Sequence, residues 1–197
     1  MAHHTLLAYS TTDGHTLHIC ERLKFVLTAL GQRVTLLPMA QAHGLDLNKF
    51  ERIVIGASIR YGHHQPQVAQ FIAAHQAFLE SRPSAFFSVN IVARKPNKNQ
   101  PDTNPYLKKF LKQISWKPPL LGVFAGKLNY PSYGWFDRQM IRLIMVITHG
   151  PTDPKAVVEF TDWTQVEAFA HAVCALPGPG TALDASAANA SQPSGPQ

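Results

Sequence analysis

The segment Tyr9-Ser10-Thr11-Thr12-Asp13-Gly14-His15-Thr16 follows an apolar strand pattern and precedes an amphipathic helical pattern. Backbone N–H groups at a helix N-terminus carry partial positive charge, so they bind phosphate together with nearby hydroxyls. The segment has no lysine and matches neither GxxxxGK(S/T) nor GxGxxG, the motifs of triphosphate and dinucleotide sites. Neutral donors around a terminal phosphate suit flavin mononucleotide (FMN). An ordinary helix N-cap at Thr11 or Asp13 is the alternative for this segment alone.

Length and composition indicate one globular domain with a core of its own. The chain has 197 residues, of which 45% are hydrophobic. Its two cysteines, Cys20 and Cys174, lie far apart in helical patterns without a secretory signal before them, so we expect free thiols in a reducing cytosol. No apolar run approaches the roughly 18–20 residues that a membrane-spanning helix needs.

Apolar strand patterns alternate with amphipathic helical patterns along the chain. Strands are expected at 6–9, 34–37, 53–57, 85–89 and 121–125. Helices are expected at 19–30, 66–80, 106–114 and 163–176. Strands that are apolar on both faces, with helices between them, predict an α/β fold whose parallel sheet is covered on both sides.

Three segments leave the carboxyl ends of predicted strands, at 10–16, 58–65 and 88–97. In doubly wound sheets, ligands bind beyond these strand ends at a topological switch point. We therefore expect the three segments to meet at one edge of the sheet and to form a site there.

Two segments depart from this alternation. Residues 129–154 form an insertion between the fifth strand and the last helix, and its apolar residues surround too much of a helix to form one amphipathic stripe. Part of it should pack on the domain, on a partner or at a lipid surface. The Pro-, Gly-, Ala- and Ser-rich segment 177–197 is predicted to be a disordered tail.

Charge is concentrated in one part of the chain, whose net charge is +6. Nine basic residues and one acidic residue, Asp102, lie between Arg82 and Lys127. Such a segment suits anionic lipid or a carboxylate-bearing substrate, and a solvated lysine face is the alternative. No nucleic-acid-binding motif accompanies the charge, so we expect no nucleic-acid partner. The histidines and cysteines lack metal-ligand spacing, so no metal is expected.

Four runs of sequence resemble one known family. They are Ser-Thr-x-Asp-Gly-x-Thr at 10–16, Ile-Gly-Ala-Ser-Ile-Arg-Tyr-Gly-His at 55–63, Ser-Ala-Phe-Phe-Ser-Val-Asn-Ile-Val-Ala-Arg-Lys-Pro at 84–96, and Trp-Phe-Asp-Arg-x-Met-Ile at 135–141. The first is shared with flavodoxins generally. Together they resemble the flavodoxin-like, quinone-dependent protoporphyrinogen IX dehydrogenases over about residues 4–176.

The resemblance implies a flavodoxin-like, five-stranded, doubly wound domain over 4–176 that binds FMN. It also implies oxidation of protoporphyrinogen IX to protoporphyrin IX in haem biosynthesis, with menaquinone or ubiquinone as the electron acceptor. The expected location is peripheral, at an anionic membrane surface on the cytoplasmic side of the inner membrane. A flavodoxin-type electron carrier and an NAD(P)H:quinone reductase are the alternatives.

The cofactor-binding residues follow from the resemblance, and the other candidates follow from the charge and apolar character of residues near the expected site. His63 and Arg60 are candidate catalytic residues, and Tyr61 is the aromatic residue that we expect to contact the flavin ring. The predicted substrate or membrane contacts are Arg94, Lys95, Trp135, Phe136, Arg138 and Arg142. The predicted cofactor-binding residues are Ser10, Thr11, Thr12, Asp13, Gly14, His15, Thr16, Ser58, Ile59, Arg60, Tyr61, Gly62, Ser88, Val89, Asn90, Ile91, Val92, Ala93 and Arg94.

Overall fold

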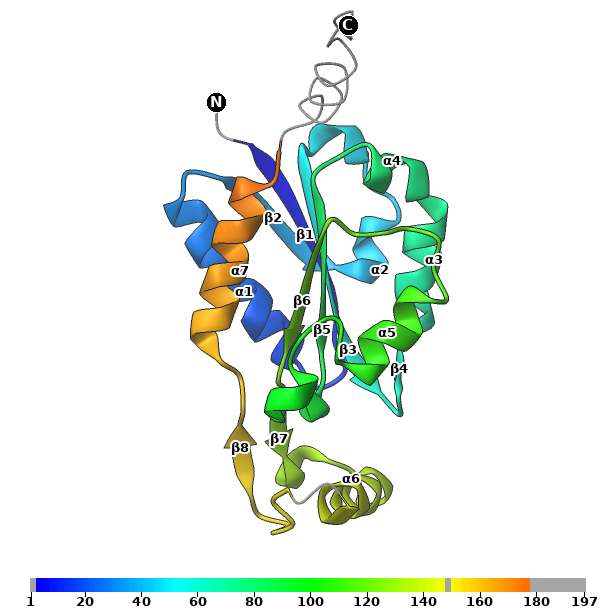
Figure 1. Cartoon of the computed structure of the whole chain (residues 1–197), viewed down its shortest axis with the longest axis vertical. Coiled ribbons are helices and arrows are strands. Elements are labelled where there is room, and N and C mark those ends of the chain that lie inside the picture. Colours follow the sequence, from blue (N-terminus) through cyan, green and yellow to red (C-terminus); the bar gives the residue numbers. More distant parts are fainter. Residues whose placement is uncertain (1–2, 148–149, 178–197) are drawn as a thin grey trace, which may run out of the picture.

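A parallel sheet forms the centre of the molecule in the computed structural model, which describes residues 3–147 and 150–177 (Figure 1). Its strands lie in the order β2-β1-β3-β5-β6, and each neighbouring pair runs parallel. This order confirms the predicted doubly wound fold class. The tail predicted for 177–197 lies outside the described residues beyond Pro177. The strands are β1 (His4–Ser10), β2 (Arg33–Pro38), β3 (Arg52–Arg60), β5 (Ser84–Val89) and β6 (Leu120–Phe124).

Helices cover both faces of the sheet (Figure 1). One face packs against α1 (His15–Ala29) and α7 (Trp163–Ala175), forming a core around Leu7, Val54 and Phe87. The opposite face forms a second core around Leu6, Ile55 and Phe86. Because both faces are buried, the strands need apolar side chains in both directions, as their sequences show. The helices of the second face are α2 (Met39–Ala42), α3 (Pro66–Ala74), α4 (Gln76–Glu80) and α5 (Pro105–Leu111).

Gly56 on β3 makes room for the ring of Phe87 on the neighbouring strand β5. A Cβ atom at this position of β3 would lie 2.2 Å from Cζ of Phe87 on the neighbouring strand β5. The Phe87 ring also packs against Phe124 and Phe169, at centroid distances of 5.3 and 5.9 Å. Any larger residue at position 56 would displace this ring from the core.

Two predicted helices differ from the observed ones. The helix expected at 66–80 is two helices, because His75 leaves the helical conformation with φ −121° and ψ 20°. The apolar spacing cannot show this break, since Phe71, Ile72 and Leu79 keep helical spacing across it. The helix expected at 106–114 ends at Leu111, after which Ile114 is still buried but no longer helical.

The insertion predicted at 129–154 forms an ordered unit beyond the carboxyl edge of the sheet (Figure 1). Strand β7 (Lys127–Asn129) pairs antiparallel with β8 (Val157–Glu159), and α6 (Trp135–Ile147) lies between them in sequence. Leu128, Tyr130, Tyr133 and Met145 form a small hydrophobic cluster inside this unit. Sequence alone did not predict the β7–β8 pair. The 3₁₀ turns of the chain are Leu47–Lys49, Ile91–Arg94, Pro96–Lys98 and Tyr130–Ser132.

A tight hairpin joins β3 to the short strand β4 (His63–His64), where Arg60 pairs with His63. Tyr61 and Gly62 form its turn with φ values of 51° and 81°. The ring of His64 is buried between Phe86 and Phe110, and its Nδ1 lies 3.1 Å from the carbonyl oxygen of Ser58. His64 therefore donates to the backbone of the segment that follows the buried part of β3.

His64 makes the folded protein sensitive to acid. Burial lowers its pKa from 6.5 to about 4, although the hydrogen bond to Ser58 opposes the shift. The folded protein keeps His64 neutral where the unfolded chain binds a proton, so stability is lost as pH falls from 6.5 towards 4. We expect a loss of about 3 kcal/mol at the lower limit, at about 1.4 kcal/mol per pKa unit.

Urea unfolding between about pH 7 and 4 measures this loss. The variant His64→Phe should show a clearly smaller decline in unfolding free energy, whereas the neighbouring exposed variant His63→Phe should decline as the wild type does. A residual slope is expected because burial also lowers the pKa of His15 and His75. Equal slopes for the wild type and His64→Phe would show that His64 is not the source.

Candidate cofactor-binding site

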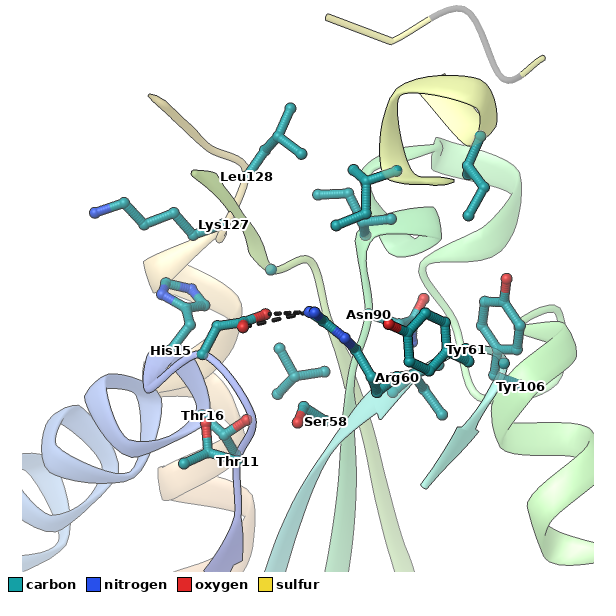
Figure 2. Close-up of a pocket in the computed structure, with 18 of the residues that line it drawn as sticks. Thr11, His15, Thr16, Ser58, Arg60, Tyr61, Asn90, Tyr106, Lys127 and Leu128 are labelled. Atoms are coloured by element: carbon teal, nitrogen blue, oxygen red, sulfur yellow. Dashed lines mark hydrogen bonds and ion pairs between the residues drawn. The ribbon is translucent and has the colours of Figure 1, made fainter. Parts of the chain in front are cut away.

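A cavity of about 500 Å³ opens at the carboxyl ends of β1, β3 and β5 (Figure 2). Cavities of roughly 300–1,000 Å³ are typical of small-molecule sites. The segments after the three strands all contribute to its wall, so they meet at one edge of the sheet as expected. The predicted residues that line the cavity are Thr11, Asp13, His15, Thr16, Ser58, Ile59, Arg60, Tyr61, Gly62, Val89, Asn90 and Ile91.

Three hydroxyls in this wall lack a hydrogen-bond partner within the described part of the chain. They are Thr11 Oγ1, Thr16 Oγ1 and Ser58 Oγ, and each atom is buried. Buried hydroxyls in folded proteins are nearly always hydrogen-bonded, because leaving one unpaired costs about 1–3 kcal/mol. Their common position on the cavity wall therefore indicates a ligand that carries oxygen acceptors.

The other hydroxyls of the first loop already have partners, which hold the loop in shape. Ser10 donates to Oε1 of Gln65 at 2.9 Å, and Nε2 of Gln67 donates to Ser10 at 3.3 Å. The amide of Gln65 donates to the carbonyl oxygen of Thr11 and to the hydroxyl of Thr12, at 3.3 and 3.4 Å. Ser10 and Thr12, predicted as cofactor contacts, are thus engaged with α3, and neither lines the cavity.

Helix α1 begins without a side-chain cap. Its N-cap is Gly14, with φ 81°, and neither Thr11 nor Asp13 caps it, so the ordinary-cap alternative is wrong. The N–H groups of Leu17 and His18 donate to the carbonyl oxygen of Gly14, whereas those of His15 and Thr16 have no partner among the described residues and remain available to an anion. His15, the first residue of the helix, is held by a 2.6 Å contact between its Nε2 and Thr161 Oγ1.

Three tyrosines also line the cavity. Tyr61 lies in the β3–β4 turn, Tyr106 at the start of α5 and Tyr133 just before α6. Only Tyr61 was predicted from the sequence. Figure 2 shows the rings of Tyr61 and Tyr106 near Asn90, at the mouth of the cavity. A planar aromatic ligand would therefore meet aromatic side chains from more than one element.

A buried asparagine pair shapes the loop after β5. The Nδ2 atom of Asn104 donates to Oδ1 of Asn90 at 3.1 Å and to the carbonyl oxygen of Lys98 at 2.8 Å. Asn104 Oδ1 accepts from the N–H groups of Tyr106 and Leu107, which caps α5. The same pair therefore fixes both the 3₁₀ turn at 91–94 and the helix that presents Tyr106.

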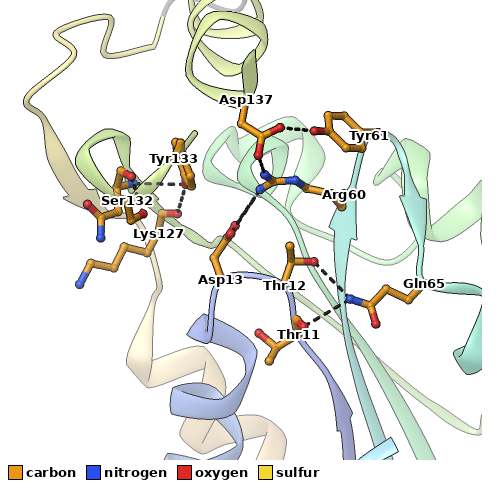
Figure 3. A network of polar contacts seen from close by, with 11 residues as sticks. Thr11, Thr12, Asp13, Arg60, Tyr61, Gln65, Lys127, Ser132, Tyr133 and Asp137 are labelled. Atoms are coloured by element: carbon orange, nitrogen blue, oxygen red, sulfur yellow. Dashed lines mark hydrogen bonds and ion pairs between the residues drawn. The ribbon is translucent and has the colours of Figure 1, made fainter. Parts of the chain in front are cut away.

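Arg60 lies at the centre of the polar contacts around the mouth (Figure 3). Its guanidinium pairs with Asp13 from the first loop and with Asp137 from α6. Burial would lower the pKa of Arg60, but the two carboxylates raise it above its usual value. Burial raises the pKa of Asp13, and Arg60 opposes that rise. Asp13 therefore lies beside the expected phosphate site with its negative charge balanced by the guanidinium of Arg60.

Several predicted residues do not line the cavity. His63 lies with Nε2 3.5 Å from Lys109 Nζ on α5, outside the cavity wall. Arg94 donates to the carbonyl oxygen of Ile91 at 3.1 Å, and its Cζ lies 6.0 Å from the Phe160 ring, so it packs beneath the insertion. The other predicted residues outside the wall are Gly14, Ser88, Val92, Ala93, Lys95, Trp135, Phe136, Arg138 and Arg142.

Several residues of the cavity wall were not predicted from the sequence. Gly126, Lys127 and Leu128 follow β6, and the rule that ligands bind beyond strand carboxyl ends would have found them. Helix α6 contributes Met140, Ile141 and Ile144; the first two lie in the run at 135–141 that carries the resemblance, but none of the three was predicted as a site residue. Among the described residues, no group of three histidine, cysteine, aspartate or glutamate side chains is placed to hold a metal ion.

Comparison with known proteins agrees with this geometry. The flavodoxin domain family matches residues 6–155. Protoporphyrinogen IX dehydrogenase (quinone) of Escherichia coli strain K12 is 44% identical over 172 residues, covering 87% of this chain and 95% of that protein. The protein of the same name from Leishmania major is 44% identical over 173 residues, covering 87% of this chain and 75% of its own length.

Solved structures support the fold. The oxidised flavodoxins 1 and 2 of Bacillus cereus each superpose with a TM-score of 0.50, at 12% and 16% identity. They cover 87% and 86% of this chain, and 97% of each flavodoxin. The sequence relatives are far more similar, with 44% identity over 87% of this chain. The chain therefore belongs to the family of flavodoxin-like, quinone-dependent protoporphyrinogen IX dehydrogenases.

Proposed function

We propose that this chain oxidises protoporphyrinogen IX to protoporphyrin IX, with FMN in the cavity and a quinone as the electron acceptor. The observation that carries the proposal is the 44% identity to protoporphyrinogen IX dehydrogenases over 87% of the chain. The unpaired hydroxyls of Thr11, Thr16 and Ser58 fit the cofactor, because FMN offers a phosphate and a polar ring edge to donors of this kind.

Each part of the cavity has a separate task in this proposal. The hydroxyls of Thr11 and Thr16 and the first turn of α1 hold the phosphate. Tyr61 and Tyr106 lie against the ring end, and Met140, Ile141 and Ile144 exclude water above it. When bound, FMN supplies the reversible two-electron redox chemistry, and the protein supplies placement and electrostatic field.

The propionates of the substrate need cationic partners near the mouth. Arg60 and Lys127 both line the cavity, and Lys127 is exposed there. Both terminal nitrogens of Arg60 already donate to Asp13 and Asp137, whereas Lys127 offers a point charge to a carboxylate. We assign substrate anchoring to Lys127, because Arg94 packs beneath the insertion instead of facing the cavity.

Two alternative functions make different predictions. A flavodoxin-type carrier would transfer electrons to protein partners and would not turn over a porphyrinogen. An NAD(P)H:quinone reductase would take electrons from a nicotinamide. The insertion that walls the cavity with Met140, Ile141 and Ile144 favours an enzyme that encloses a bulky apolar substrate.

Anaerobic turnover separates these functions. The FMN-loaded protein should convert protoporphyrinogen IX to fluorescent protoporphyrin IX under nitrogen when a menaquinone analogue is present, and should stop when the quinone is omitted. NADH-driven quinone reduction without porphyrin formation would establish the reductase instead. Flavin reduction by a partner protein, with neither activity, would establish the carrier.

Substitution of the unpaired hydroxyls should change stability and cofactor affinity in opposite directions. Thr11→Val and Thr16→Val each remove a buried hydroxyl that lacks a partner, so the ligand-free protein should gain about 1 kcal/mol of unfolding free energy. FMN affinity should fall roughly 10- to 100-fold, because a hydrogen bond to a charged group is worth about 1.5–3 kcal/mol.

Thr5→Val is the matched control for these variants. The hydroxyl of Thr5 is also buried and without a partner among the described residues, but it lies in β1 outside the cavity wall. We expect the same gain in stability with unchanged FMN affinity. Fluorescence titration of ligand-free protein with FMN measures the affinities. If all three variants bound FMN as tightly as the wild type, the phosphate would have to lie elsewhere.

The outer face of α6 supports a peripheral membrane location. Its exposed apolar residues recur at helical spacing, from Phe136 through Leu143 to Ile147, and Trp135 beside them is 76% exposed. Arg142 is exposed on the same helix. None of the helices in 3–147 and 150–177 combines the length and hydrophobicity that a bilayer crossing requires. We therefore propose that α6 lies on an anionic membrane surface, from which apolar substrate and quinone reach the cavity.

Vesicle sedimentation tests this location. The triple variant Phe136→Ser, Leu143→Ser, Ile147→Ser should lose more than about 100-fold in partitioning to phosphatidylglycerol-containing vesicles, because each apolar side chain contributes about 1.5–3 kcal/mol when buried. Flavin absorbance should remain, since none of the three lines the cavity. Phe25→Ser, which removes an equally exposed ring from α1, should sediment as the wild type does. Undiminished sedimentation of the triple variant would exclude α6 as the contact.

A further inference from the structure

Arg60 connects the cofactor loop to the insertion through two carboxylates (Figure 3). Its Nη1 atom donates to both oxygens of Asp13, at 3.0 and 3.3 Å. Its Nη2 atom donates to Oδ2 of Asp137, in the first turn of α6. The three residues belong to the loop after β1, the end of β3 and the insertion, so one guanidinium joins three separate elements at the cavity mouth.

Asp137 also holds a second residue of the mouth. Its Oδ1 atom accepts a hydrogen bond from the hydroxyl of Tyr61, while Oδ2 accepts from Arg60. Both oxygens of this carboxylate are therefore occupied by donors from the β3–β4 hairpin. The hydrogen bond to Asp137 raises the pKa of Tyr61. The tyrosine therefore stays protonated, as a donor must.

The surroundings of Tyr61 leave its ring with little other support. Tyr61 is 60% exposed, and its backbone φ of 51° lies in the left-handed region, which is unfavourable for a residue with a side chain. The Arg60 guanidinium carbon lies 5.3 Å from the Tyr61 ring centroid and 5.7 Å from that of Tyr133. The Tyr61 ring, which we expect to face the flavin, is thus oriented by its hydrogen bond to Asp137 and by Arg60, which Asp137 also binds.

The ion pair between Arg60 and Asp137 is partly shielded from water. The side chains of Arg60 and Asp137 are 21% and 24% exposed, so water screens them less than it screens a surface ion pair. Inside the insertion, Leu128, Tyr130, Tyr133 and Met145 form an apolar cluster, against which Ile91 from the loop after β5 packs. Apolar contacts of this kind are non-directional, whereas the carboxylate fixes a direction for two side chains.

We propose that Asp137 is a positioning residue that fixes Arg60 and Tyr61 at the ring end of the cavity and fastens α6 across its mouth. The insertion then completes the cofactor site, in addition to any contact with substrate or membrane. This inference rests on the proposed occupancy of the cavity by FMN for its effect on the flavin, but its effect on α6 is independent of any ligand.

Asp137→Asn tests the proposal, because it keeps the shape of the side chain and removes the charge. FMN affinity should fall about tenfold, within the 5- to 150-fold range of about 1–3 kcal/mol couplings between sites. Bound-flavin fluorescence should rise, since a Tyr61 ring that is no longer fixed quenches it less. The matched control is Asp153→Asn, which makes the same change in the same insertion, where the carboxylate accepts only from the N–H of Lys155 among the described residues.

A double variant shows whether Asp137 acts through Arg60. Arg60→Gln alone should weaken FMN binding, and adding Asp137→Asn should cost little more, because the two substitutions break one interaction. Fully additive losses would show that Asp137 does not act through Arg60. Unchanged affinity and fluorescence in Asp137→Asn would overturn the positioning role.

Trypsin cleavage of the ligand-free protein tests the same residue without the cofactor. Arg142 is an exposed cleavage site on α6, five residues after Asp137, so the substitution does not alter the bond's immediate sequence. Cleavage after Arg142 should accelerate severalfold in Asp137→Asn and stay at the wild-type rate in Asp153→Asn. Equal rates in all three proteins would show that Asp137 does not fasten α6. A wild type that binds no FMN would refute the proposed function while leaving this readout intact.

Discussion

Parallel pairing of β1 with β3, and of β3 with β5, is the constraint on which the site depends. The registers place Ser10 beside Ala57 and Ala57 beside Ser88, so the three strands reach the edge of the sheet together. Both faces of the sheet are covered by helices, so the segments that follow the three strands meet beyond its carboxyl edge. The hydroxyls of Thr11, Thr16 and Ser58 come together there without a partner among the described residues.

The insertion adds a further wall to this edge, and the cavity lies between that wall and the loops after the strands. Helix α6 contributes Met140, Ile141 and Ile144 to the cavity wall, while the adjacent part of its surface exposes Phe136, Leu143 and Ile147. Together the two sets cover more of the helix than one amphipathic stripe, as its sequence indicated.

Prediction from the sequence succeeded where local pattern and chain order decide the structure. The parallel sheet and the convergence of the three loops follow from apolar strands separated by helices. The unpaired hydroxyls of Thr11 and Thr16 lie in the segment 9–16, which the sequence marked as a candidate phosphate site. Prediction failed where the hydrogen-bond partners of a residue come from distant segments of the chain. Gln65 and Gln67 engage Ser10, and Thr161 holds His15, contacts that span 55, 57 and 146 residues. No local pattern encodes such pairs.

The fold class and the family were predictable from the sequence alone, which also suggested a candidate phosphate loop at 10–16. Periodicity of apolar residues selects strands and helices, and a short motif suffices for a loop whose function depends on its own backbone. What the insertion contributes to the site depends on the tertiary structure. Asp137 meets Arg60 and Tyr61, 77 and 76 residues away in the chain, because β3 and α6 are brought together across the cavity mouth. An ion pair of that separation is specified by packing, not by any pattern along the chain.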